Sequence, residues 1–298
     1  MGKDRRDGGR LGAGVSRVVY VNGAFVPEAE ACVSVFDRGF LFADAVYEVT
    51  SVLDGRLIDL PAHLARLDRS LREIGLPRPA TDAELEELHR RLVRENGLTE
   101  GLVYLQVTRG VAERNFLYPP DPRPTLVLFT QALPLVDRPE ARAGLRIVTL
   151  DDPRWARRDI KTVQLLSASM AKEIAHARGK DDAWFVEDGL VTEGTASNAH
   201  LVSRDGTIVT RDLSSAILAG ITRAAILAHA AEAGVAVEER PFTVAEAQSA
   251  AEAFVTGATA FVLPVVEIDG APIGDGRPGP TVRRLRARYI EESRRRSV

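Results

Sequence analysis

Residues 191–198 read Val-Thr-Glu-Gly-Thr-Ala-Ser-Asn and place one acidic residue among small polar ones. The stretch leads directly into Ala-His-Leu-Val at 199–202, a mainly apolar segment typical of a strand. By itself the pattern fits a hairpin turn as well as a binding loop, because glycine and small polar residues serve both purposes. Its meaning depends on two other stretches of the chain.

The second stretch, residues 158–162, reads Arg-Asp-Ile-Lys-Thr and places Lys161 after an apolar residue at the end of a strand or loop. The third, residues 218–223, reads Leu-Ala-Gly-Ile-Thr-Arg. A glycine before a predicted helix leaves free backbone N–H groups, and such groups bind phosphate. Each stretch is weak alone, because single lysines and helix starts are common.

In this order and spacing, the three stretches together resemble the class IV aminotransferases, the fold-type IV enzymes that use pyridoxal 5'-phosphate (PLP). The resemblance runs from Tyr20 to about Ile273. Several further stretches are similar to bacterial D-amino-acid transaminases: Phe-Asp-Arg-Gly-Phe-Leu-Phe at 36–42, Asp-Ala-Val-Tyr-Glu-Val at 44–49, His-Leu-Ala-Arg-Leu at 63–67, Gln-Val-Thr-Arg-Gly at 106–110 and Asp-Ile-Lys at 159–161.

The resemblance implies an α/β (α+β) fold in two domains, with PLP between them. We expect a small N-terminal α/β domain over residues 17–133 and a larger C-terminal domain with a barrel-like β core over residues 143–298. Residues 134–142 are the predicted linker, because the surrounding segment combines two prolines with mixed charges. Residues 1–16 are rich in glycine and charge, and we expect them to form a disordered tail.

Local patterns predict the elements of the first half. Asn22-Gly23 supplies the positive φ angles of a tight hairpin turn. Thr81-x-x-Glu84 is a capping-box pattern that starts a helix. The remaining predictions are strands at 47–53, 102–108 and 125–130, a helix at 60–74, and a long loop at 110–124.

The second half is predicted in the same way. Alternating and helical patterns of apolar residues indicate strands at 145–150, 183–187 and 199–202, helices at 166–176, after Gly220 and at 244–253, and strands around Phe254 and Phe261.

The family likeness implies the two central chemical roles. Lys161 matches the lysine that binds PLP as a Schiff base and moves the proton between the substrate and the cofactor. A free lysine has a pKa of about 10.4, so a lysine base needs burial or a nearby cation. Glu193 matches the acid that keeps the pyridine nitrogen protonated, which makes the ring an electron sink.

The other implied cofactor contacts surround these two residues. Arg66 matches a phosphate contact, and an arginine suits a bidentate phosphate bond. Ala258 stands where relatives usually carry threonine, so Thr259 or backbone groups substitute for it. The remaining implied contacts are Ser197, Asn198, Leu218, Gly220, Ile221 and Thr222.

Substrate recognition is implied by Tyr47 and by a loop motif. In D-amino-acid transaminases an Arg-x-His pair binds the substrate carboxylate. Here the pair aligns with Arg114-Asn115-Phe116, so the arginine is present and Phe116 replaces the histidine. We therefore expect a broader range of D-amino acids, with some turnover of (R)-amines. Arg109 lies nearby in the sequence and is expected to be structural, or to take over if Arg114 does not bind the carboxylate.

Composition excludes several other classes. The net charge is −3, and no basic block lies among aromatics, so a nucleic-acid partner is not expected. No membrane span is expected either. The single cysteine, Cys32, is interpreted as a small buried or half-buried residue. The five histidines form no metal-like cluster. We expect a cytoplasmic enzyme without a metal and, from the resemblance, a homodimer acting on small-molecule substrates.

The functional hypothesis is a transaminase that exchanges the amino group of a D-amino acid, such as D-Ala or D-Glu, with a 2-oxo acid by a ping-pong mechanism. One alternative on the same fold is a branched-chain L-amino-acid transaminase. Another is a lyase similar to aminodeoxychorismate lyase.

Overall fold

The computed structural model describes residues 16–298, so most of the predicted tail at 1–16 lies outside the described residues. Six strands before residue 133 form one sheet in the order β2-β1-β6-β5-β3-β4. Asn22 and Gly23 have φ angles of 46° and 99°, which confirms the predicted hairpin turn. The strands are β1 (Val18–Val21), β2 (Ala24–Pro27), β3 (Ala45–Leu53), β4 (Arg56–Leu57), β5 (Glu100–Thr108) and β6 (Thr125–Ala132).

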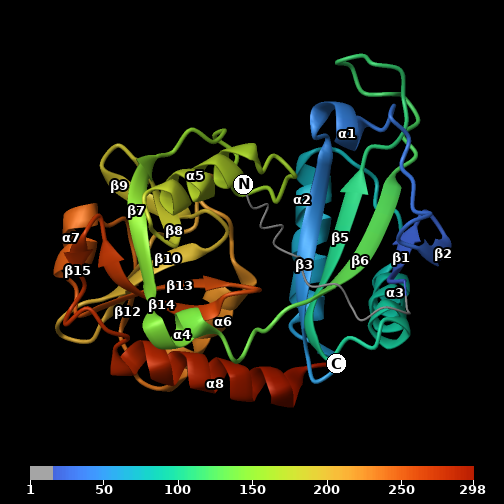
Figure 1. Cartoon of the computed structure of the whole chain (residues 1–298). Coiled ribbons are helices and arrows are strands. Elements are labelled where there is room, and N and C mark those ends of the chain that lie inside the picture. The colour runs from blue at the N-terminus through green and yellow to red at the C-terminus, as the bar shows by residue number, and fades with distance from the viewer. Residues whose placement is uncertain (1–15) are drawn as a thin grey trace, which may run out of the picture.

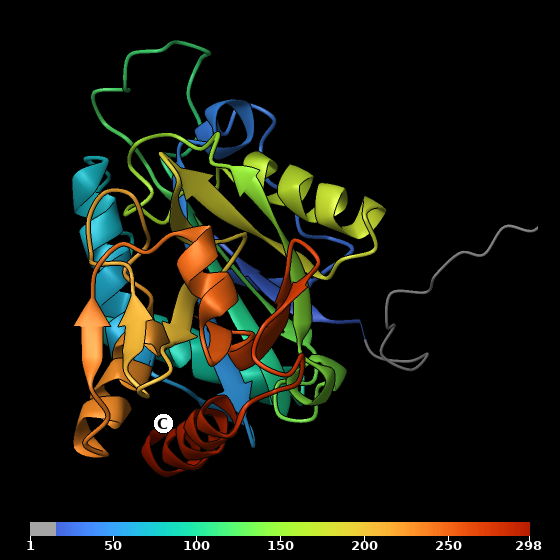
Figure 2. The same cartoon turned by 90° about the vertical axis from the view of Figure 1, so that its left-hand side faces the viewer.

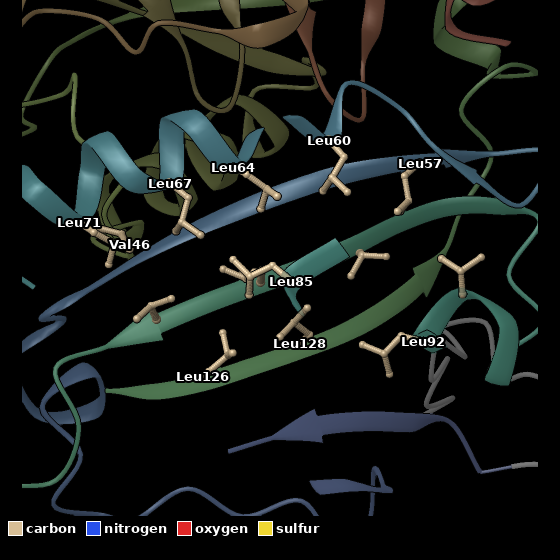
Figure 3. Packing of buried hydrophobic residues seen from close by; sticks show 14 of the residues in the cluster. Val46, Leu57, Leu60, Leu64, Leu67, Leu71, Leu85, Leu92, Leu126 and Leu128 are labelled. Atoms are coloured by element: carbon tan, nitrogen blue, oxygen red, sulfur yellow. The ribbon is translucent and has the colours of Figure 1, made fainter. Parts of the chain in front are cut away.

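Two helices, α2 (Leu60–Glu73) and α3 (Asp82–Glu95), cover one face of this sheet, and the short α1 (Arg38–Phe42) precedes β3. Leucines at helical spacing on α2 point toward the strands and toward Leu85 and Leu92 of α3 (Figure 3). Each buried leucine stabilises this contact by about 1.5–3 kcal/mol. Thr81 and Glu84 form the predicted capping box at the start of α3.

Nine strands after residue 144 form a second sheet. Its main path runs in the order β12-β11-β10-β13-β14-β7-β8-β9, and β15 pairs with β14. The strands are β7 (Leu145–Asp151), β8 (Asp182–Glu187), β9 (Leu190–Gly194), β10 (Asn198–Val202), β11 (Ile208–Thr210), β12 (Val237–Glu239), β13 (Glu252–Gly257), β14 (Phe261–Ile268) and β15 (Ala271–Pro272).

This second sheet curls upon itself. Strands β9 and β10 lie far apart in the order of the sheet, yet only residues 195–197 connect them. The edge strand β9 must therefore return to the neighbourhood of β10, which confirms the predicted barrel-like core. The connecting residues include the acidic stretch with which the sequence argument began.

The remaining helices pack around the second sheet. They are α4 (Pro139–Ala143), α5 (Leu166–Ala177), α6 (Ile221–Glu232), α7 (Val244–Ser249) and α8 (Pro280–Arg296). Figure 1 shows the two sheets side by side, with α8 running beneath the second sheet toward the first. Helix α8 ends with exposed Arg294–Arg296, and Val298 pairs with Leu57 of the first sheet.

Two sequence predictions are wrong. The helix predicted at 244–253 ends at Ser249, because Glu252 belongs to β13 and its carboxylate accepts hydrogen bonds from the N–H groups of Thr281 and Val282 at the start of α8. Cys32 is exposed, since it lies in the surface segment after β2. The domain limits at 17–133 and 143–298 stay a prediction. Among residues 16–298, no helix is long and apolar enough to cross a membrane.

Candidate active site

A cavity of about 760 Å³ lies between the two sheets. The three stretches that opened the sequence argument all reach its wall. Every residue that the resemblance implied for the cofactor lines it, as does Tyr47: Tyr47, Arg66, Lys161, Glu193, Ser197, Asn198, Leu218, Gly220, Ile221, Thr222, Ala258 and Thr259.

Lys161 enters the cavity from the loop between β7 and α5. Its carbonyl accepts a hydrogen bond from the N–H of Tyr47 at 3.0 Å, and its neighbour Thr162 pairs with Val46. The Lys161 amine lies 4.3 Å from the centre of the Tyr47 ring and has no ion pair or hydrogen bond with any residue in the described part of the chain. This amine is therefore free to react with a carbonyl compound in the cavity.

Glu193 is buried at the end of β9. One carboxylate oxygen accepts a hydrogen bond from Arg154 at 2.5 Å. The other accepts bonds from the Asn198 amide at 3.2 Å and from the Leu218 N–H at 3.1 Å. Burial raises the pKa of Glu193 above its usual value, and the Arg154 guanidinium opposes that rise. Arg154 thus favours an ionised acid inside the cavity.

Sequence reasoning missed Arg154 and the residue that holds it, Asp152. The Arg154 guanidinium bridges the carboxylates of Asp152 and Glu193. Asp152 also accepts a hydrogen bond from the Thr192 hydroxyl at 2.8 Å. The only local signal was the Asp-Pro-Arg turn at 152–154, which does not reveal that its arginine reaches β9.

Free N–H groups also line the cavity at the start of α6 and in the turn 257–259. Gly220 precedes α6, and within residues 16–298 no side chain caps the first N–H groups of this helix. A Cβ at Gly220 would lie 2.0 Å from the Asn198 side-chain oxygen, so glycine permits this close approach. The turn 257–259 lines the same cavity. Helix N-terminal amides and turn amides together suit an anionic group such as a phosphate.

Arg66 is held firmly beside these groups. Its Nε and Nη2 atoms donate to the Glu48 carboxylate at 2.8 Å, and its Nη1 atom donates to the Ala219 carbonyl at 2.9 Å. Burial alone would raise the pKa of Glu48, but Arg66 and His63 lower it to about 2. Each Nη atom carries a second hydrogen, so Arg66 can still donate to a ligand in the cavity.

Arg114 and Phe116 lie outside the cavity of their own chain. Both are exposed on the loop 110–124. The Arg114 guanidinium lies 5.6 Å from the centre of the Phe42 ring and 5.7 Å from that of Phe116, and it forms no hydrogen bond or ion pair with the described residues. In Figures 1 and 2 this green loop projects beyond the rest of the molecule, next to α1. A single chain therefore does not bring Arg114 to Lys161.

Arg109 anchors the base of that loop. It is buried, and its guanidinium donates to the Asp44 carboxylate and to the carbonyls of Ile74 and Gly75. The Tyr118 ring stacks on it at 3.6 Å. These contacts confirm the structural role expected for Arg109.

The wall of the cavity suits PLP. A cofactor with an aldehyde, a pyridine nitrogen and a phosphate needs an amine, an acid and a set of N–H donors. The cavity offers these as the Lys161 amine, the buried Glu193 carboxylate and the amides around Gly220 and Ala258. When bound, PLP supplies an electron-withdrawing ring and an aldehyde that carries an amino group.

The chain matches the amino-transferase class IV family over residues 45–268 and belongs to that family. It is 40% identical over 279 residues to the D-alanine aminotransferase of Staphylococcus aureus (strain MSSA476), with 92% of this chain and 98% of the relative covered. It is 39% identical over 267 residues to the D-alanine aminotransferase of Bacillus licheniformis, with 90% and 94% covered.

Solved structures agree with this assignment. The branched-chain aminotransferase of the archaeon Thermoproteus uzoniensis, solved with norvaline, is 28% identical and superposes with a TM-score of 0.82. The superposition covers 93% of this chain and 94% of the other. A second branched-chain amino acid aminotransferase, solved with pyridoxamine 5'-phosphate, is 29% identical with a TM-score of 0.87 and covers 95% of this chain and 96% of its own. These findings confirm the predicted family and the two-part α/β fold of fold type IV.

Proposed function

We propose that this chain is a PLP-dependent D-amino-acid aminotransferase, which exchanges the amino group of a D-amino acid with the oxo group of a 2-oxo acid in ping-pong order. The observation that carries this proposal is the free Lys161 amine in a cavity that also holds the buried Glu193 carboxylate. The curated relatives at 39–40% identity carry the D-alanine aminotransferase name. The branched-chain structures lie at 28–29% identity or below and support that alternative less strongly.

Each residue of the cavity has a task in this reaction. Lys161 binds the cofactor and moves the proton at the α-carbon of the donor. Glu193, kept ionised with the help of Arg154, holds a proton on the pyridine nitrogen. Arg66 and the amides at Ile221 and Thr222 hold the phosphate. Tyr47, whose ring lies against the Lys161 amine, faces the substrate.

The carboxylate of the substrate needs an unpaired arginine, and the cavity wall formed by the described residues of one chain offers none. Three arginines of the cavity wall, Arg66, Arg154 and Arg158, are already paired with carboxylates. Arg114 is exposed and has no carboxylate partner among the described residues. We therefore propose that the loop 110–124 of a second copy brings Arg114 to the cavity, in a homodimer.

Exposed apolar side chains support the dimer. Phe40, Phe116 and Leu117 keep 74%, 79% and 77% of their surface exposed, and they lie on α1 and on the loop 110–124. An exposed apolar patch of this kind is typical of a surface that another chain covers.

A cytoplasmic location also stays a prediction.

A panel of donors tests the proposed function. Purified protein with PLP should show the visible absorbance of lysine-bound cofactor. Adding D-Ala or D-Glu without a 2-oxo acid should remove this absorbance in a half-reaction. L-Leu should react much more slowly, and (R)-1-phenylethylamine slowly but measurably. A preference for L-Leu would favour the branched-chain alternative, and release of pyruvate from aminodeoxychorismate would favour the lyase.

A further inference from the structure

Five charged side chains form a series that runs from the protein surface to the wall of the cavity. In order from the surface they are Glu187, Arg158, Asp152, Arg154 and Glu193, and we call them the charge series. Both Nη atoms of Arg158 donate to the Glu187 carboxylate, at 2.7 and 2.9 Å. Arg154 then links the carboxylates of Asp152 and Glu193. Negative and positive groups therefore alternate along the whole series.

Asp152 holds Arg154 through more hydrogen bonds than Glu193 does. Its carboxylate accepts from the Arg154 Nε atom at 2.9 Å and from Nη2 at 2.7 Å, whereas Glu193 accepts only from Nη1 at 2.5 Å. The Asp152 side chain is fully buried. Burial alone would raise the pKa of Asp152, but the hydrogen bonds and the charge of Arg154 lower it below its usual value. Asp152 is therefore a buried, ionised partner of Arg154.

The charge that Glu193 presents to the cavity depends on Asp152. Three carboxylates and two guanidinium groups give the charge series a net charge of −1. Lys161 and Arg66 also act on Glu193 as cations. If Asp152 were neutral, Arg154 would balance Glu193 alone and leave it little net charge. Because Asp152 balances Arg154, Glu193 keeps its negative charge, and buried charges are screened far less than exposed ones.

The outer pair of the charge series leaves Asp152 available to Arg154. Arg158 is buried and could compete for Asp152, but its Nη atoms are both bonded to Glu187. Its Nε atom lies 3.4 Å from Asp152 and makes no hydrogen bond within the described chain. Glu187 thus balances Arg158 at the surface end, and Asp152 serves mainly Arg154.

We propose that Asp152 is a positioning residue that acts through Arg154. It fixes the guanidinium and balances its charge, so that Glu193 can hold a proton on the pyridine nitrogen of PLP. Arg158 and Glu187 support this role from the surface. This inference rests on the proposed function, because it assumes that the cavity binds PLP.

Nitrogen NMR of PLP labelled at its ring nitrogen tests the proposal on the full-length chain, because the chemical shift reports how far that nitrogen is protonated. Asp152→Asn keeps the shape of the side chain and removes its charge. We expect the ring nitrogen to hold its proton about tenfold less tightly, with its signal displaced toward the unprotonated position. The single-turnover rate with D-Ala should fall by about the same factor.

A double variant separates the effect of charge from that of structure. Asp152→Asn combined with Arg154→Met removes both charges and leaves Glu193 negative. Its nitrogen signal should lie closer to that of the wild type than the signal of Asp152→Asn does. A merely structural role predicts the reverse, because the double variant loses more hydrogen bonds. Asp151→Asn is the matched control, since Asp151 is the exposed neighbour at the end of β7, and it should keep the wild-type signal.

Glu187→Gln is a variant that spares the buried part of the series, because 40% of the Glu187 side chain is exposed. It should displace the nitrogen signal in the same direction as Asp152→Asn, by about twofold in proton affinity.

The outcomes separate the two proposals. The role of Asp152 is wrong if the folded variants of Asp152 and Glu187 keep the wild-type nitrogen signal. It is also wrong if the double variant lies further from the wild type than Asp152→Asn. A wild-type chain that binds no PLP overturns the proposed function itself.

Discussion

The cavity and the loop 110–124 handle charge in opposite ways. In the cavity, Arg66, Arg154 and Arg158 are paired with carboxylates and largely withdrawn from water. On the loop, Arg114 is exposed, lies over the rings of Phe42 and Phe116, and has no carboxylate partner among the described residues. A single chain thus holds the residues proposed to bind the cofactor in place. The arginine proposed to bind the substrate carboxylate has to come from a second chain.

The largest effect is expected from Lys161→Ala, at the centre of the cavity. Removing the amine removes both the bond to the cofactor and the proton carrier, so activity should fall by several orders of magnitude. The visible absorbance of lysine-bound cofactor should vanish as well. A variant with near-normal turnover and an unchanged spectrum would exclude Lys161 from this role.

Glu48→Gln should damage the scaffold of the cavity. It leaves Arg66 as a buried cation without its partner, which costs about 3–5 kcal/mol of folding free energy. The folded pKa of Glu48 is about 2, below its usual 4.5, so its stabilisation is present above pH 4.5 and is lost as the pH falls toward 2.

Melting temperatures of the wild type and of Glu48→Gln, measured against pH, test both the loss of stability and its dependence on pH. The difference between wild type and Glu48→Gln should be constant from pH 7 to pH 5 and should shrink at lower pH. A difference that stays the same down to pH 3 would mean that Glu48 is not the group that titrates.

Glu193→Gln keeps the shape of the side chain and removes its charge. Loss of one preorganised electrostatic contact of this kind slows the chemical step by about 10²–10³-fold. PLP should still bind, because the phosphate end of the cavity is untouched. Single-turnover rates with D-Ala provide the measurement, and an unchanged rate would show that Glu193 does not serve the pyridine nitrogen.

Arg114→Ala should give the smallest effect and the most selective one. A charge-assisted bond to a carboxylate contributes about 1.5–3 kcal/mol, so kcat/KM for D-Ala should fall about ten- to a hundredfold. (R)-1-Phenylethylamine has no carboxylate and should react as before. An unchanged ratio of the two kcat/KM values would move attention to Tyr47, because Arg109 is buried, paired with Asp44 and absent from the cavity wall.

Mixing two impaired variants sharpens the comparison further. A Lys161→Ala chain still has an intact loop, and an Arg114→Ala chain still has an intact lysine. If the loop acts on the partner's cavity, unfolding and refolding the two together should restore D-Ala activity through mixed dimers with one complete site. Each variant refolded alone is the control, and activity that never exceeds the sum of the two controls would contradict the dimer.

Sequence patterns predicted what local forces determine. Helix α3 follows from its capping box, α2 from its leucine spacing, and the first hairpin from Asn22-Gly23. The helix predicted at 244–253 is too long, because α7 ends at Ser249. The spacing of its alanines does not show that Glu252 lies in a strand and caps α8.

The residues proposed to bind the cofactor follow from the resemblance, whereas the side chains that support them do not. Arg154 meets Glu193 only after the second sheet curls, and Arg158 meets Glu187 only after β7 and β8 have paired. Neither contact has a fixed spacing in the sequence. The position of Arg114 likewise depends on a loop whose path no local pattern determines.

The backbone of Lys161 belongs to the second half of the chain but pairs with the first. Residues 161–163 lie along the beginning of β3, with hydrogen bonds from Tyr47 to Lys161 and from Val163 to Ala45. Separating the two halves therefore breaks the pairing that aims the amine. In a chain whose halves have not yet docked, Lys161 is not held against β3, so we expect it to bind PLP no more tightly than any other exposed lysine until tertiary assembly is complete. Capture of the cofactor can then report on correct folding, and hydrogen exchange at Tyr47 and Val163 should slow at the same moment.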